Sequence, residues 1–123
     1  MVLVLKFRLV YAPGSLYTSI LPCLALRSVG QLIATSPSLT HKILLLNSTL
    51  DRETPGYSSL DFVKAISLAC NRAYGEDEET KRTFEPMSFV THVVYLEGSE
   101  VRVEKDELEV SLPFFCTVEL GWS

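Results

Sequence analysis

The side chains best suited to chemistry in this sequence are two histidines and three cysteines. Nucleophilic catalysis places a cysteine or serine beside a general base, and the imidazole bases on offer are His41 and His92. The thiols are Cys23, Cys70 and Cys116. Neither a Gly-x-Ser-x-Gly nor a Cys-x-x-Cys sequence surrounds any of these residues. We therefore expect structural roles for all of them and predict no catalytic residue.

Two further patterns bear on ligand binding. Residues 76–79 are four adjacent carboxylates, which lack the alternating ligands and central glycine of a calcium loop. They are typical of a solvated acidic loop, so we predict no metal site. Pro13-Gly14-Ser15 precedes a predicted helix, as a phosphate-binding turn does. It lacks the other glycines and the lysine of a P-loop, so we set it aside and predict no cofactor.

Composition limits the partners and the compartment. The 123 residues have the size of one domain, 1–123, with a net charge of −4. Acidic residues outnumber Lys and Arg by 15 to 11, which argues against nucleic-acid binding. An odd number of widely spaced cysteines is typical of reduced thiols, so we expect a cytoplasmic protein. The longest uncharged run, residues 9–26, is interrupted by Pro13 and Pro22, which argues against a membrane span.

The first half of the chain predicts two βα units. Residues 2–11 alternate in the manner of one strand, and a helix follows Ser15, either kinked at Pro22 or beginning near it. Residues 41–46 are almost wholly apolar, as in a central strand. A polar loop over 47–57 then leads to a helix over 58–74. Ser58 and Asp61 have the spacing of a capping box at its start.

The second half predicts a meander of strands. Residues 89–96 are rich in β-formers, and Glu97-Gly98-Ser99 is a hairpin signal. Alternating apolar residues over 101–104, 108–112 and 114–120 predict further strands. The expected fold class is therefore α+β: a mostly antiparallel sheet with two helices, in the order β-α-β-α-β-β-β(-β). The two βα units could add a parallel pair.

Apolar residues form 47% of the chain and occupy both faces of several predicted strands. Two helices are too few to shield two sheet faces, so we expect a partner chain on one of them. The preferred function is a non-enzymatic protein–protein interaction or assembly subunit, with a homodimer as its simplest form. The predicted interface residues are Val4, Val10, Phe114, Phe115 and Trp122.

Three alternatives stay open. The opening strand, the helix and residues 41–50 are similar to the start of the core of rhabdovirus matrix proteins, which implies a viral structural assembly protein. The second alternative is a small enzyme with His92 as base and Cys116 or Tyr95 as its neighbour. The third is a small-ligand carrier with an apolar cavity between sheet and helices.

Overall fold

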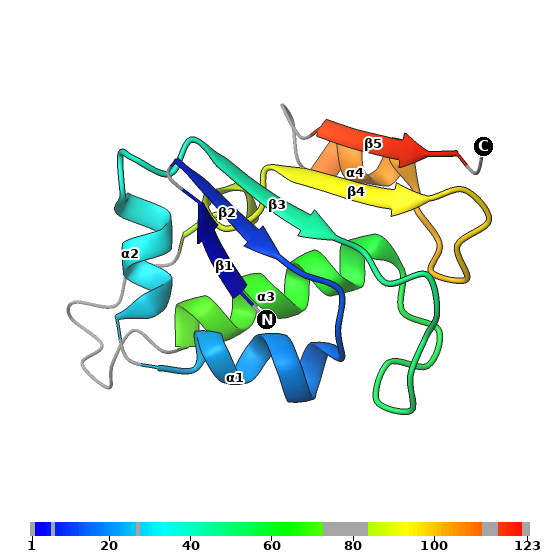
Figure 1. Cartoon of the computed structure of the whole chain (residues 1–123), viewed down its shortest axis with the longest axis horizontal. Helices are drawn as coiled ribbons and strands as arrows, with labels where there is room; N and C mark the ends of the chain where they lie inside the picture. Colours follow the sequence, from blue (N-terminus) through cyan, green and yellow to red (C-terminus); the bar gives the residue numbers. More distant parts are fainter. Residues whose placement is uncertain (1, 6, 27, 73–83, 112–115, 122–123) are drawn as a thin grey trace.

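A five-stranded sheet organises the part of the chain that the structure describes. The structure is a computed structural model, and it describes residues 2–5, 7–26, 28–72, 84–111 and 116–121. The strands lie in the order β1-β2-β3-β4-β5 (Figure 1). Their bounds are β1 Val2–Leu5, β2 Arg8–Tyr11, β3 His41–Leu45, β4 His92–Leu96 and β5 Cys116–Leu120. Only β1 runs antiparallel to its neighbour, and β2 to β5 are parallel.

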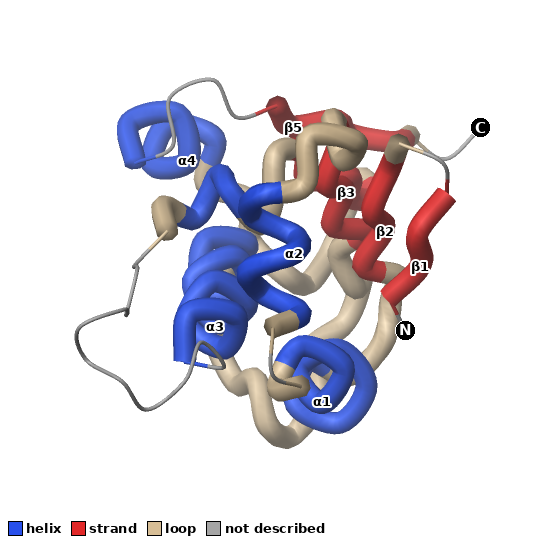
Figure 2. The backbone as a smooth tube through the Cα atoms, turned by 90° about the vertical axis from the view of Figure 1, so that its left-hand side faces the viewer, coloured by secondary structure: helices blue, strands red, loops and turns tan. Residues whose placement is uncertain are grey.

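The helices lie on one side of this sheet, as Figure 2 shows. A π-helical turn η1 (Leu16–Ile20) runs into α1 (Leu21–Leu24), and α2 (Val29–Thr35) follows. The others are α3 (Ser59–Arg72), the 3-10 turn η2 (Pro86–Ser88) and α4 (Lys105–Ser111). Parallel neighbours need crossovers of one hand, so strands added in sequence order place every crossover helix on the same face.

The predicted fold class is wrong. The sheet is mixed and mostly parallel, with four α-helices in the described ranges, so the fold is α/β rather than α+β with two helices and a mostly antiparallel sheet. The turn predicted at Gly98 exists, with a φ of 76° and a bond from Ser99 N–H to the Leu96 carbonyl. The chain after this turn does not form a hairpin with β4; it passes through α4 and then forms β5, which is parallel to β4.

The error arose in residues 101–111. Here Lys105–Ser111 forms α4 instead of a strand, and Leu108 packs fully buried in the core. Asp106 and Glu107 lie in the first helical turn, where the helix dipole favours acidic side chains. An alternating pattern of only a few residues fits one buried position on a short helix as well as it fits a strand.

The predicted strand over residues 2–11 is two strands. Leu5 pairs with Arg8 across a tight turn, so β1 folds back on β2 as a hairpin. Pro22 lies in the first turn of α1, directly after the π-helical turn, which agrees with a helix that begins near the proline. Strand β3 is central, as predicted, although its Lys42 is buried on the helix side and donates to the Ser88 carbonyl at 2.6 Å.

The two faces of the sheet differ in cover. The face toward the helices carries buried side chains such as Leu9, Leu44 and Val93. No described helix packs on the opposite face, named here the uncovered face, whose central residues are Val10, Ile43, Val94 and Val118. Of the predicted interface residues, Val10 is half-buried there. Val4 is 63% exposed on the edge strand β1, and Phe114, Phe115 and Trp122 lie outside the described residues, as do residues 76–79.

Among the described residues, no single helix has the length and apolar composition to cross a bilayer. A bent pair, Leu16–Leu24 with Val29–Thr35, meets that test only when its two arms are taken together across a 77° bend.

Candidate functional site

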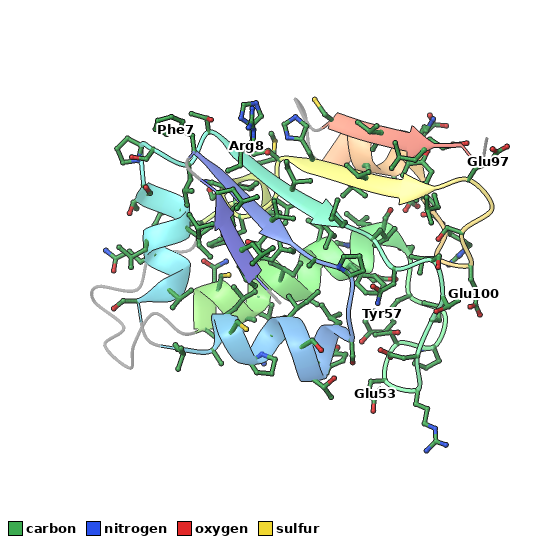
Figure 3. The ribbon with its side chains drawn as sticks, viewed as in Figure 1. Phe7, Arg8, Glu53, Tyr57, Glu97 and Glu100 are labelled. Carbon is green, nitrogen blue, oxygen red and sulfur yellow. The ribbon has the colours of Figure 1, made fainter. Side chains whose placement is uncertain are left out.

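The loops that follow the parallel strands meet at the carboxyl edge of the sheet. Ligands in open α/β sheets bind in the crevice at this edge. Figure 3 shows Tyr57, Glu97 and Glu100 at the end toward which β2, β3 and β4 point, with Phe7 and Arg8 at the opposite end. A ligand site is therefore expected at the carboxyl edge.

Asn47, two residues after the end of β3, joins the loops that follow β2, β3 and β4. Its Oδ1 accepts from the Gly14 N–H at 2.8 Å, and its Nδ2 donates to the Gly14 carbonyl at 2.7 Å. Its own carbonyl accepts from the Ser99 hydroxyl at 3.3 Å. The neighbouring Ser48 carbonyl accepts from the Glu100 N–H at 2.8 Å. One amide side chain thus fixes the loop after β2, and its backbone helps to fix the loop after β4.

The loop after β2 leads straight into a helix start. Ser15 precedes η1, and the first helical bonds run to its carbonyl from Ser19 and Ile20. No side chain of the described residues caps this end. The N–H groups of a first helical turn have no partner within the helix, and they carry the positive end of its dipole. The helix start therefore presents unpaired donors at the carboxyl edge of the sheet.

A tight turn lies beside this helix start. Thr54 is buried and donates to Asp51 Oδ1 at 2.9 Å, and the same oxygen accepts from the Glu53 N–H at 3.1 Å. The bond from Thr54 is the main cause of a lowered pKa at Asp51. The Ser15 hydroxyl lowers that pKa further, although its buried Oγ makes no hydrogen bond of ordinary geometry to a described residue. The Ser15 hydroxyl therefore lies near the Asp51 carboxylate without a close hydrogen bond to a described residue.

Two tyrosines border the same region. The hydroxyls of Tyr17 in η1 and Tyr57 in the long loop lie 2.6 Å apart, and this bond is the main cause of a raised pKa at Tyr17. Their rings meet edge to face at 6.3 Å, and Tyr57 packs in the same manner on Phe62 of α3. The tyrosine pair anchors the long loop to the helix start.

A cleft of about 240 Å³ opens at the carboxyl ends of β4 and β5. Its lining includes Tyr95, Ser99, Arg102, Lys105 and Glu119. The Tyr95 hydroxyl donates to Glu119 Oε2 at 2.9 Å, and Arg102 pairs with Glu104 at 3.3 Å. Ser99 in its lining also donates to the Asn47 carbonyl, and this bond links the wall of the cleft to the loop after β3.

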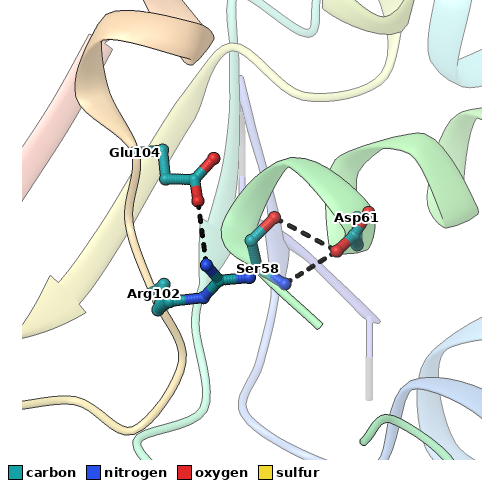
Figure 4. A network of polar contacts seen from close by, with 4 residues as sticks. All are labelled: Ser58, Asp61, Arg102 and Glu104. Carbon is teal, nitrogen blue, oxygen red and sulfur yellow. Dashed lines mark hydrogen bonds and ion pairs between the residues drawn. The ribbon is translucent and has the colours of Figure 1, made fainter. Parts of the chain in front are cut away.

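The far end of the long loop is fixed at the start of α3. Asp61 Oδ2 accepts from the Ser58 N–H at 2.8 Å and from its hydroxyl at 3.1 Å, which confirms the predicted capping pair (Figure 4). Ser58 also bridges to Arg102, and the Ser59 N–H donates to the Arg102 carbonyl at 2.8 Å. The loops after β3 and β4 are therefore joined at both ends.

The residues proposed for a small enzyme lie elsewhere. His92 begins β4 at the amino edge, and its register partner on β5 is Cys116, on the same face. Tyr95 points to the helix side. The described neighbours of His92 include the Thr91 hydroxyl and the His41 ring, and no carboxylate hydrogen bond to it is found among them. The structure thus brings His92 to Cys116 but not to Tyr95, and it leaves both outside the cleft.

Comparison with known proteins gives the family. Residues 8–115 match the family described as 2-phospho-L-lactate transferase CofD. This chain belongs to the CofD family. The uncharacterized protein YNL011C of Saccharomyces cerevisiae is 35% identical over 106 residues, which are 81% of this chain and 24% of the yeast protein. A putative gluconeogenesis factor of Nostoc is 38% identical over 63 residues, which are 50% of this chain and 13% of that protein.

The CofD-family chain spans about a quarter or less of the length of these relatives. No solved structure matches it. Its mostly parallel sheet is consistent with a Rossmann-like fold. The match with a transferase family and with a gluconeogenesis factor overturns the predicted non-enzymatic assembly subunit, together with its viral-matrix alternative.

The loop over Pro13-Gly14-Ser15, for which the sequence predicts no site, lies within the candidate site. It lacks the lysine and the extra glycines of a P-loop. Its partner is Asn47, 33 residues further along the chain. The sequence does contain a signal for this contact. Gly14 lies in a turn after the first predicted strand, and Asn47 follows the next predicted strand, residues 41–46.

Proposed function

We propose that this chain forms the phosphate-binding part of a CofD-family domain that holds a phosphorylated small molecule. The observation that supports this proposal is the helix start after Ser15, which lies at the carboxyl edge of the sheet and is held there by Asn47. An anion at a helix N-terminus accepts hydrogen bonds from the free N–H groups and is stabilised by the helix dipole.

Side chains near the helix start and in the cleft could contact the phosphate and the remainder of the ligand. The Ser15 Oγ can turn to donate to a phosphate oxygen, because its contact with the Asp51 carboxylate is not a close hydrogen bond. The cleft at the ends of β4 and β5 carries Arg102 and Lys105 beside Glu119 and Tyr95, so it suits a polar group that both accepts and donates. The proposed ligand therefore has a phosphate at the helix start and a polar remainder in the cleft.

The family description names a transferase of 2-phospho-L-lactate, a small phosphorylated acid. Binding such a phosphate fits the helix start. Group transfer by the longer family proteins would also need residues from the segments that this chain does not cover. Transferase activity is therefore a proposal for the family domain as a whole, and phosphate binding is the share we assign to this chain.

Titration calorimetry of the 123-residue chain with 2-phospho-L-lactate and with inorganic phosphate tests this proposal. We expect both to bind and to shift the NMR amide signals of Gly14 to Thr18. Ser15→Ala should weaken binding several-fold, because one donor is lost. Asn47→Ala should weaken it at least tenfold, because the loop loses two hydrogen bonds of roughly 1 kcal/mol each.

The matched control is Ser38→Ala, an exposed serine between α2 and β3 at the opposite edge. It should bind as the parent does. Circular dichroism melts confirm that each variant is folded. Amide signals that stay unchanged at a ligand concentration of roughly 10 mM would overturn the proposal, because binding weaker than that is not specific. Equal affinity of Asn47→Ala and the parent would overturn it as well.

Two expectations from the sequence stay proposals. One is that a protein partner or a second copy contacts this chain, and light scattering of the purified chain over a range of concentrations tests it. The other is a cytoplasmic location, which fluorescence microscopy of the tagged full-length protein tests.

A further inference from the structure

Both histidines of the chain lie side by side at the amino edge of the sheet. The sequence contains two histidines, 51 positions apart, and the parallel pairing of β3 with β4 brings them together. The ring centroids of His41 and His92 are 5.4 Å apart, with the ring planes tilted by 41°. His41 is exposed and His92 is half-buried on the uncovered face. This is the end of the sheet opposite to the proposed phosphate site.

Each ring is oriented by the threonine that precedes it. Thr40 Oγ1 lies 2.9 Å from His41 Nδ1, and Thr91 Oγ1 lies 2.7 Å from His92 Nδ1. Each hydroxyl also donates to a main-chain carbonyl, that of Phe7 at 3.4 Å for Thr40 and that of Lys42 at 3.2 Å for Thr91.

This arrangement suits one tautomer of each ring. A hydroxyl has one proton, so a threonine that gives it to the carbonyl can accept from the imidazole Nδ1–H. With the proton on Nδ1, the Nε2 atom of each ring keeps its lone pair for a metal ion. Histidines that ligate metals are held in the same manner, because a second hydrogen bond fixes the tautomer and orientation of the ring.

The separation of the rings matches one shared ion. A zinc–nitrogen bond is about 2.0 Å, and the ring centre lies about 1.1 Å beyond the nitrogen, so the ion lies about 3.1 Å from each centroid. Two ligands at a tetrahedral angle then have centroids about 5.1 Å apart, close to the observed 5.4 Å.

We propose that His41 and His92 form a two-histidine site for a transition-metal ion of the Zn²⁺ or Ni²⁺ class, with water as its remaining ligands. Imidazole is a preferred ligand of these ions. No group of three or more metal-binding side chains converges within the described ranges, so the histidines are the protein's ligands there. Among the described residues, the charged or titratable side chains beside these rings in the strand register are Arg8, next to His41, and Cys116, next to His92.

Calorimetry with Ni²⁺ and with Zn²⁺ tests this site. Exposed thiols also bind these ions, so the titrations use a Cys23→Ser/Cys116→Ser variant next to the parent chain. We expect affinities within threefold of each other, because Cys116 is not a ligand. A loss in this variant, which keeps only the buried thiol of Cys70, as large as that caused by removing a histidine would overturn the two-histidine assignment.

Substitution of either ring gives the decisive comparison. His41→Ala and His92→Ala should each weaken binding at least tenfold in that background, and the double variant should abolish it. His41 is exposed, so His41→Ala should fold normally and keeps the test valid if His92→Ala is unstable. Equal affinity of the background and His41→Ala would overturn the proposal.

The orienting role of Thr40 gives an independent readout. Thr40→Val removes the hydroxyl that holds His41 and should weaken Ni²⁺ binding by about tenfold, the low end for loss of such a partner. Thr35→Val is the matched control, since its hydroxyl bonds only within α2, to the Gln31 carbonyl, and it should leave affinity unchanged. Cu²⁺ electron paramagnetic resonance should show nitrogen hyperfine splitting from two imidazoles, and a spectrum without nitrogen coupling would overturn the site.

Discussion

Gly30 in α2 lies against the backbone of α3, and replacing it by alanine should destabilise the fold. A Cβ at this position would lie 2.4 Å from the Cys70 carbonyl oxygen, 2.8 Å from its carbon and 2.9 Å from its Cα. Backbone atoms cannot rotate away as a side chain can. The two helices must therefore separate by about 1 Å to restore ordinary contact, which disturbs the packing on both sides.

Two opposing effects set the magnitude. Overpacking of this kind costs about 1–3 kcal/mol, and the backbone contact places Gly30→Ala at the upper end. Alanine in a helix gains back about 1 kcal/mol relative to glycine. We expect a net loss of about 2 kcal/mol, which for a chain of this size lowers the melting temperature by roughly 8 °C.

Urea and thermal denaturation followed by circular dichroism measure this effect. The control is Gly56→Ala: nothing lies within 4 Å of its added Cβ, but its φ of +70° strains an alanine, so it should cost about 1 kcal/mol. Gly56→Asn should restore much of that loss, because asparagine tolerates this conformation. A Gly30→Ala variant as stable as the parent would refute the close contact of α2 with α3.

Two further predictions concern α3. Asp61→Ala removes the acceptor for the Ser58 N–H and should lower the free energy of unfolding by about 1 kcal/mol in urea titrations, whereas a change near zero would mean that the cap contributes nothing. Burial raises the pKa of the Cys70 thiol to about 12, so this thiol should resist alkylation at pH 8 while the exposed thiols react. The unfolded thiol ionises near pH 9, at lower pH than the folded one, so the stability contributed by the buried neutral thiol should be present below about pH 9 and lost as pH rises toward 12. Urea midpoints at pH 8 and 10 measure that loss, and a Cys70→Ala variant with an unchanged alkaline decline would contradict it.

The elements that could be predicted from sequence are those in which a single periodicity extends over enough residues. The helix after Ser58 and the central strand after His41 are examples, since each pattern has one structural solution. Residues 101–111 carry too few apolar positions to separate a strand from a two-turn helix. The sheet topology depended on that choice, because a helical crossover makes β5 parallel to β4.

The candidate sites were less predictable for a different reason. Gly14 and Asn47 are ordinary loop residues until β2 and β3 are known to be parallel neighbours, which places both at the carboxyl edge. His41 and His92 are likewise isolated residues in the sequence and become a pair only through the register of β3 with β4. In both cases the function-bearing feature is a contact between distant segments, and periodicity along the chain carries no information about it.

The segment between Asn47 and Ser58 is tethered at both ends to the loop after β4, through the Ser48–Glu100 and Ser59–Arg102 backbone bonds. Its conformational freedom is thus lost on folding rather than on ligand binding, so a ligand at this edge meets walls that are already ordered. The conformational entropy lost in ordering these loops therefore lowers the stability of the fold and not the affinity for the ligand. Molecules that fit the preformed shape bind more tightly than those that would require the two loops to separate.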